Sequence, residues 1–315
     1  MLVLSVLAAG CGGGPEPRRT ASSAAPRSAA APAVGAGGRL VAIGHGRRLY
    51  AQCAGSGRPT VVLEAGFPGD STVWSAVQPR LARTTRTCAY DRAGLGSSPP
   101  ARGARGARGA RDARDEIDDL RRLLGAAHLP APYVLVGHSY GGMLAQLFAR
   151  THPSETAGVV LVDARGRDAT RRQLAIWPAS VATSARRAVF RRVQRGVDLR
   201  AGEAVASQVR SLGAVPLAVV TAGHHDKDWG AVLPPRLSRR FDALWTRMQD
   251  ELAALSADHV HVVALRSDHF VQALDDGQPD VVVRAVAAVV RAARNRTRLP
   301  PCGRLFGGAD VRCAG

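Results

Sequence analysis

The chain has 315 residues, of which 46% are hydrophobic, and this is enough for one large buried core or two small ones. Its formal net charge is +18, and Lys227 is the only lysine, so nearly all of the positive charge comes from arginine. Only 4% of the residues are aromatic and the sequence contains no recognisable nucleic-acid-binding motif, so no nucleic-acid partner is expected and only attraction to an anionic lipid surface stays open.

Residues 1–38 have the features of an export segment followed by a tether. Met1 to Ala9 form an apolar run that is too short to span a bilayer and is typical of a signal peptide. The run from Leu7 to Cys11 resembles the lipobox of bacterial lipoproteins, in which the cysteine carries lipid. Residues 12–38 are mostly Gly, Pro, Ala and Ser, a composition that cannot form a core. We therefore expect an exported protein that is anchored to a membrane through Cys11, or otherwise secreted.

Four further cysteines support an oxidising compartment, because their number is even. They are Cys53, Cys88, Cys302 and Cys313. Four cysteines allow three pairings. The short loop between Cys302 and Cys313 suggests one bridge, which leaves Cys53 to pair with Cys88. Buried free thiols are the alternative.

From Arg39 onward the pattern is that of a folded domain in which strands alternate with helices. Strands are predicted at residues 40–43, 48–53, 60–64, 87–90, 134–136, 158–164, 217–222 and 260–265. Helices are predicted at residues 74–81, 115–124, 143–152 and 280–293, and the Gly-Ala-Arg repeat at 101–111 is predicted to be a loop. This order predicts an α/β fold, with a mainly parallel sheet covered by helices on both faces.

The stretch from Val134 to Gly142 is the feature most indicative of function. An apolar strand runs into G-x-S-x-G and then into a helical pattern, which is the order that a nucleophile elbow requires. Gly137 and Gly141 leave room for a tight turn, so that Ser139 is exposed at the carboxyl end of the strand. The positive end of the helix dipole would point at this serine. The alternative, a plain glycine-rich turn, does not explain the strand and helix on either side.

Residues 165–212 interrupt the alternation of strands and helices. They are rich in arginine and have helical spacing through Leu174, Ile176, Trp177 and Val181. An insertion between two core strands at the carboxyl edge of the sheet is placed where a lid would lie. We predict a helical lid, with an ordinary surface insertion as the alternative.

Four motifs together resemble those of the α/β-hydrolase fold family, within which the group of prolyl-iminopeptidase-like and small-ester hydrolases is the most similar. The motifs are Glu64-Ala65-Gly66-Phe67, Tyr90 to Ser97, Gly137 to Gly142, and Asp268-His269-Phe270. The resemblance implies the strand order 1-2-4-3-5-6-7-8. It covers roughly residues 39–294. We therefore predict a hydrolase core at residues 39–164 and 213–294, a lid insertion at 165–212 and a tail at 295–315 with a disulfide loop. That order places the strand of Cys53 beside the strand of Cys88, which supports their pairing.

The family uses a Ser-His-acid triad in the chain order Ser, acid, His. The resemblance therefore implies Ser139 as the nucleophile and His269 as the general base. It implies the backbone amides of Phe67 and Tyr140 as the donors to an oxyanion. His138 fills the variable position of the elbow, and no catalytic role is expected for it.

The triad acid is open among several aspartates. Asp226 is the first choice, because it follows the penultimate strand, where the family usually carries this residue. Asp163, at the end of the preceding strand, is the alternative, and a slip of two residues would give Asp228. Asp268 is a poor candidate, because the side chains of adjacent residues diverge.

No metal or organic cofactor is expected. The run His224-His225-Asp226 could suggest a metal site, but three adjacent residues do not easily converge on one ion. His45, His259 and His261 lack a motif and are interpreted as structural or exposed.

The expected function is a serine hydrolase that cleaves a carboxylic ester or a small amide through an acyl-enzyme. Two alternatives stay open: a ligand-binding protein with this fold and little turnover, or an exported surface interaction protein that uses its basic tether.

Overall fold

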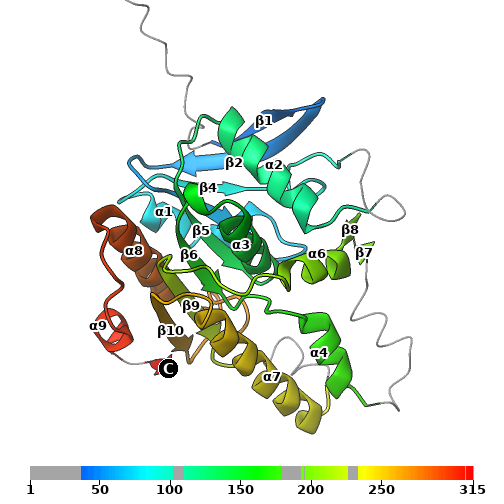
Figure 1. Ribbon diagram of the computed structural model, residues 1–315, viewed down its shortest axis with the longest axis vertical. Coiled ribbons are helices and arrows are strands. Elements are labelled where there is room, and N and C mark those ends of the chain that lie inside the picture. Colours follow the sequence, from blue (N-terminus) through cyan, green and yellow to red (C-terminus); the bar gives the residue numbers. More distant parts are fainter. Residues whose placement is uncertain are drawn as a thin grey trace, which may run out of the picture. The chain divides into compact units, whose positions relative to one another are not determined.

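The computed structural model describes residues 37–101, 110–178, 193–194, 196–225, 233–308 and 310–314. Its centre is a nine-stranded sheet in the order β1-β2-β4-β3-β5-β6-β9-β10-β11 (Figure 1). The strands of this sheet are β1 Arg39–Gly44, β2 Arg47–Ala54, β3 Thr60–Glu64, β4 Thr87–Tyr90, β5 Tyr133–His138, β6 Thr156–Val162, β9 Leu217–Ala222, β10 His259–Ala264 and β11 Val311–Ala314. The predicted α/β-hydrolase fold is confirmed, and β11 is an additional strand at the edge.

Six neighbouring strands of the sheet, β4, β3, β5, β6, β9 and β10, are parallel to one another. The pairs β1–β2, β2–β4 and β10–β11 are antiparallel. Every residue of β3, β4, β5 and β9 is buried, as expected of a parallel sheet that is covered on both faces. Alternate side chains of each strand point into two separate cores.

Helices cover both faces of the sheet (Figure 1). They are α1 Gln78–Leu81, α2 Ala113–Ala126, α3 Tyr140–Thr151, α4 Ala169–Ile176, α6 Leu199–Ala206, α7 Pro235–Ala253, α8 Pro279–Asn295 and α9 Cys302–Phe306, with short 3-10 turns at η1 Ser71–Trp74 and η3 Pro153–Glu155. The apolar sides of α2 and α3 line one core, and those of α1 and α8 line the other. No helix within the described residues is both long and apolar enough to cross a membrane.

Local sequence explains where α2 begins. The Asp112 side chain accepts a hydrogen bond from the Arg114 backbone, and the Asp115 side chain accepts one from the Asp112 backbone, which together form a capping box. Such a cap stabilises a helix by about 1 kcal/mol. Ile117, Leu120, Leu123 and Leu124 follow at helical spacing and are buried, so the predicted apolar face is confirmed.

Three elements differ from the prediction. The helix predicted at 74–81 is in fact η1 followed by the separate four-residue helix α1, although Trp74, Val77 and Leu81 are all buried as expected. The long helix α7 was not predicted. The predicted tail at 295–315 contains α9 and β11, so the sheet extends beyond residue 294.

Both predicted cysteine pairs are disulfides. Cys53 and Cys88 lie opposite each other on the antiparallel strands β2 and β4. Cys302 and Cys313 join α9 to β11, and this bridge holds the edge strand against the body of the domain. Cys11 and the whole lipobox-like run lie outside the described residues.

The insertion between β6 and β9 contains α4, the small pair β7 Val193–Gln194 and β8 Val197–Asp198, and α6. Helix α6 packs against α2 and α3, and α4 packs against α7. Val181 and its surroundings lie outside the described residues. The lid function of this segment stays a prediction.

Candidate active site

The turn between β5 and α3 has the conformation of a nucleophile elbow. Ser139 has a φ of 51° and a ψ of −116°, a backbone conformation that non-glycine residues rarely adopt, and its side chain is partly exposed. A Cβ at Gly137 would lie 2.4 Å from the carbonyl oxygen of Gly141. A Cβ at Gly141 would lie 2.3 Å from the carbonyl oxygen of Glu64. Only glycine fits at these two positions, as the sequence pattern predicted.

The loop after β3 lies directly against this serine. A Cβ at Gly66 would lie 3.1 Å from the Cβ of Ser139 and 2.7 Å from Nδ1 of His138, so the loop approaches the elbow as bare backbone. The ring of the next residue, Phe67, packs edge-on against the ring of Tyr140, with 5.9 Å between their centroids. The two residues predicted to supply oxyanion amides therefore lie side by side near Ser139.

His269 and Asp163 are in direct contact. Nδ1 of His269 lies 2.6 Å from Oδ2 of Asp163. Asp163 follows β6 and is fully buried, whereas His269 follows β10 and is partly exposed. Asp268 instead accepts a hydrogen bond from the backbone of His269 at 2.7 Å. Although Asp268 is adjacent to His269 in the sequence, its carboxylate binds the main chain of that residue.

The structure therefore places the alternative acid, Asp163, on the imidazole of His269. Asp226, the first choice, and Asp228 both lie outside the described residues. Asp163 also has a positive φ of 40°, which turns the chain at the end of β6 so that its side chain points toward β9 and β10.

Asp163 accepts three further hydrogen bonds. Its Oδ1 accepts from the Ala222 backbone at 3.0 Å and from Nε1 of Trp245 at 2.9 Å, and its Oδ2 lies 2.9 Å from Nε2 of His225. Burial favours the neutral acid, but His225 and His269 together outweigh burial and hold the pKa of Asp163 well below its usual range. This carboxylate is therefore charged across the neutral pH range.

His225 is buried between two carboxylates. Its Nε2 faces Asp163, and its Nδ1 lies 3.2 Å from Oδ1 of Asp242 on α7. Burial disfavours the charged imidazolium, but the charge of Asp163 is the main opposing effect and the pKa of His225 rises to about 10. Both ring nitrogens then act as donors.

The sequence pattern does not indicate the roles of His225, Asp242 and Trp245. One signal was present along α7, where apolar residues follow helical spacing. All of them are buried: Leu237, Phe241, Leu244, Trp245, Met248 and Leu252. That spacing predicts a helix. It does not reveal that Trp245 and Asp242 face the end of β6.

His138 supports the loop that carries His269. Its Nε2 lies 3.0 Å from the carbonyl oxygen of His269, and the two rings are 4.6 Å apart between centroids. Burial, assisted by the nearby His269, lowers the pKa of His138 to about 3, so this ring is neutral and donates from Nε2. Among the described residues, the Ser139 hydroxyl makes no hydrogen bond to His269. In hydrolases without a bound substrate, the bond between nucleophile and base is often long and forms fully only when substrate binds.

One group of side chains in the described part of the chain has the convergence that a metal ion requires. The ligand atoms of Asp163, His225 and His269 lie within 4.8 Å of one another. The hydrogen bonds among them already account for this convergence, so we assign no metal. His224 is not part of the group, and its Nδ1 lies 4.0 Å from Oδ2 of Asp268. His45 and His259 are exposed, while the buried His261 lies 2.7 Å from the hydroxyl of Thr221.

The sequence model of the family described as alpha/beta hydrolase fold matches residues 59–225, which are more than half of the chain. This chain belongs to the α/β-hydrolase family. YqjL, an uncharacterised protein of Bacillus subtilis, is 25% identical over 217 residues, covering 67% of this chain and 83% of that protein. Several other curated relatives match over shorter stretches, which span only 15% to 40% of those proteins.

Solved structures show the same fold at low sequence identity. A thermophilic esterase from Thermogutta terrifontis is 22% identical with a TM-score of 0.52, and the match covers 81% of this chain and 98% of the esterase. The enol-lactonase from Burkholderia xenovorans LB400 is 18% identical with a TM-score of 0.53, covering 80% of this chain and 99% of that one.

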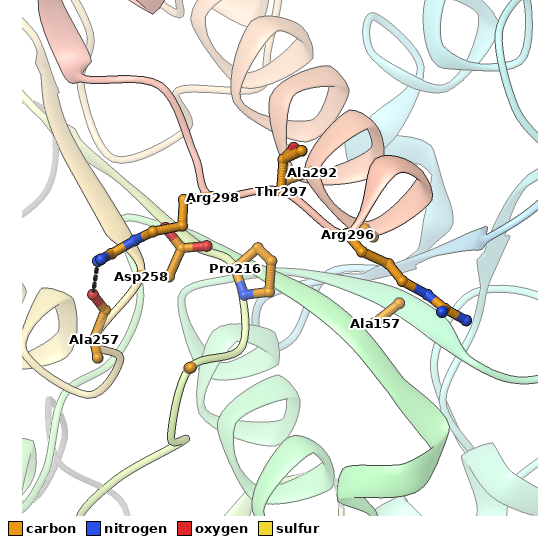
Figure 2. A pocket seen from close by; sticks show the side chains of 10 residues that line it. Ala157, Pro216, Ala257, Asp258, Ala292, Arg296, Thr297 and Arg298 are labelled. Atoms are coloured by element: carbon orange, nitrogen blue, oxygen red, sulfur yellow. Dashed lines mark hydrogen bonds and ion pairs between the residues drawn. The ribbon is translucent and has the colours of Figure 1, made fainter.

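A separate hollow of this hydrolase lies where the strands begin (Figure 2). Its volume is about 470 Å³, and its lining includes Ala157, Pro216 and Asp258, which lie at the amino ends of β6, β9 and β10. Arg298 closes one side by donating to the carbonyl of Ala257 at 2.6 Å. Ser139, Asp163 and His269 all follow the carboxyl ends of their strands, so this hollow is not next to them.

Proposed function

We propose that this α/β-hydrolase is a serine hydrolase that cleaves a carboxylic ester or a small amide through an acyl-enzyme. The observation that carries the proposal is the contact of 2.6 Å between Nδ1 of His269 and Oδ2 of Asp163, beside a serine in an elbow. A carboxylate on Nδ1 keeps the proton there, so that Nε2 is free to accept one.

The chemistry follows in two halves. The Oγ of Ser139 attacks the substrate carbonyl carbon while its proton moves to Nε2 of His269. The carbonyl electron pair moves to the oxygen, which accepts hydrogen bonds from the amides of Phe67 and Tyr140. Collapse of this intermediate expels the alcohol or amine, which takes the proton from His269. Water, deprotonated by His269, then attacks the acyl carbon. The bond to Oγ of Ser139 breaks, Oγ takes the proton back from His269, and the acid is released.

The first experiment replaces the nucleophile. Ser139→Ala should keep the fold and lower turnover of p-nitrophenyl esters or aminoacyl-anilides by about 10^6. The matched control is Ser211, an exposed serine in the segment that leads to the amino end of β9, and Ser211→Ala should act within about twofold of wild type. A fluorophosphonate probe should label wild type but not Ser139→Ala. A folded wild type that neither turns over these substrates nor labels would favour the ligand-binding alternative.

The second experiment decides the acid, for which we propose Asp163. Asp163→Asn should lower turnover by about 10^4, because the imidazole then loses the group that orients it and stabilises its charge. If Asp163 is the acid, Asp226→Asn should cost about tenfold at most, which is the scale of a screened charge that does not contact the imidazole. A large loss in Asp226→Asn together with near-normal turnover in Asp163→Asn would reverse the assignment.

We also propose that the enzyme is exported and tethered to a membrane by lipid on Cys11. The lipobox-like run and two disulfides support this location. Metabolic labelling with a fatty acid should mark the wild type, and Cys11→Ser should lose both the label and the membrane association. A Cys11→Ser protein that stays in the membrane fraction would contradict the anchor.

A further inference from the structure

A cluster of charged and phenolic side chains lies buried behind the loop that carries Phe67. Its members are Glu64, Tyr90, Arg92, Glu116 and Tyr140, each at most 4% exposed. Burying an arginine with two carboxylates is expensive unless each charge is paired. Such a cluster beside a proposed active site calls for an explanation beyond stability.

Arg92 is at the centre of the cluster. Its Nη1 donates to Oε1 of Glu64 at 2.5 Å and to the carbonyl of Ala65 at 2.5 Å, and its Nη2 donates to the carbonyl of Gly66 at 3.0 Å. Its Nε lies 3.3 Å from Oε1 of Glu116. Burial alone would lower the pKa of Arg92, but Glu64 and Glu116 raise it further than burial lowers it. The guanidinium is therefore a permanently charged and rigid fork.

The contact with Gly66 determines how the next peptide group is oriented. The carbonyl of Gly66 and the N–H of Phe67 belong to one planar peptide unit and point in opposite directions. A donor that holds the Gly66 carbonyl therefore also sets the direction of the Phe67 N–H. The second contact, to Ala65, keeps the preceding peptide unit from rotating in compensation.

The same guanidinium also reaches the residue that would supply the other amide. The central carbon of the Arg92 guanidinium lies 5.3 Å from the centroid of the Tyr140 ring. The Tyr140 hydroxyl donates to Oε2 of Glu116, which is held near Arg92 by charge. Tyr140 in turn packs against the ring of Phe67.

We infer that Arg92 is a positioning residue, which holds the Phe67 and Tyr140 amides in the arrangement that stabilises the tetrahedral oxyanion. This inference rests on the proposed serine hydrolase function. A displaced donor weakens binding of the oxyanion much more than binding of the substrate, because only the oxyanion needs both amides.

The test is Arg92→Lys, which keeps the positive charge between the carboxylates but cannot hold Glu64 and both carbonyls with one planar group. We expect kcat on p-nitrophenyl butyrate to fall about 10²-fold, as when one oxyanion donor is lost, with KM changed by less than about threefold. Phenylboronic acid, which forms a tetrahedral adduct with an active serine, should bind weaker by a similar factor.

Arg111 offers a matched control. It is also a buried arginine that pairs with a carboxylate, Asp119, and donates to a backbone carbonyl, that of Asp115. It does not contact the loop of Gly66 and Phe67. Arg111→Lys should keep kcat and boronate affinity within about threefold of wild type, so a general effect of removing a buried guanidinium would be visible there.

Circular dichroism and thermal unfolding establish whether each variant is folded. If Arg92→Lys does not fold, Tyr140→Phe decides the question, because it removes one hydroxyl from the cluster and keeps the Tyr140 amide. It should lower kcat and boronate affinity together by at least about threefold. A folded variant with unchanged kcat and boronate affinity overturns the inference. The proposed function fails separately, if Ser139→Ala retains turnover.

Discussion

Replacement of His225 by asparagine tests the charge network around Asp163. In the folded protein Asp163 and Asp242 outweigh burial and raise the pKa of His225 from its ordinary value of 6.5 to about 10. Its folded pKa is raised, so its contribution to stability is complete below about pH 6.5 and disappears as the pH rises toward about 10. In that window the folded state holds a proton that the unfolded state has released.

The size of the effect follows from the same shift. A difference of 3.5 units between 10 and 6.5, at 1.36 kcal/mol per unit, gives a ceiling of about 5 kcal/mol. His225→Asn cannot titrate and cannot neutralise Asp163 and Asp242. We therefore expect the variant to be less stable than wild type by a few kcal/mol near pH 6, with the gap narrowing as the pH rises toward about 10.

The assay is urea unfolding, followed by tryptophan fluorescence, at a series of values from about pH 6 to about pH 10. His45 provides the control, because it is an exposed histidine with a φ of 53° that asparagine also tolerates. His45→Asn should follow the wild-type curve. Glu64, whose pKa burial raises to about 7, is present in all three proteins, so its contribution cancels in the comparison. Parallel curves for wild type and His225→Asn would refute the reasoning.

Three further predictions concern stability. Trp245→Phe keeps an aromatic ring but removes a donor to the charged Asp163, and should lower the free energy of unfolding by about 2 kcal/mol in chemical denaturation. The double variant Cys53→Ser/Cys88→Ser opens a loop with a sequence separation of 35 and should lose about 4 kcal/mol in chemical denaturation; wild type treated with reductant should lose at least as much, because reductant also opens the Cys302–Cys313 bridge. Gly141→Ala would place a Cβ 2.3 Å from the Glu64 carbonyl and should lower the free energy of unfolding by about 3 kcal/mol or prevent folding. Its control is Gly125→Ala on α2, where a Cβ would have nothing within 4 Å and should raise the free energy of unfolding by about 1 kcal/mol. Equal stabilities of these two variants would contradict the elbow geometry.

Local sequence alone was sufficient for the elbow, the buried strands and most helices. Gly137 and Gly141 flank Ser139 within five residues, and the turn that they permit depends on their own lack of side chains. The uninterrupted apolar runs of β5, β6 and β9 indicate a parallel sheet, because both faces of such strands are buried. The short loop between Cys302 and Cys313 was likewise enough to suggest their pairing.

Only the tertiary structure decided which carboxylate meets His269. Asp163 and His269 are 106 positions apart, and several aspartates follow strands at the same edge of the sheet, so position along the chain could not separate them. The same holds for His225 and Trp245, which contact Asp163 although they lie 62 and 82 positions away in the sequence. It also holds for Arg92, which follows β4 and donates to the carbonyls of Ala65 and Gly66 after the adjacent strand β3. Periodicity shows that a side chain is buried. Which polar partner it finds there depends on strand order, on the path of α7 and on side-chain orientation, and these are settled only when the whole domain packs.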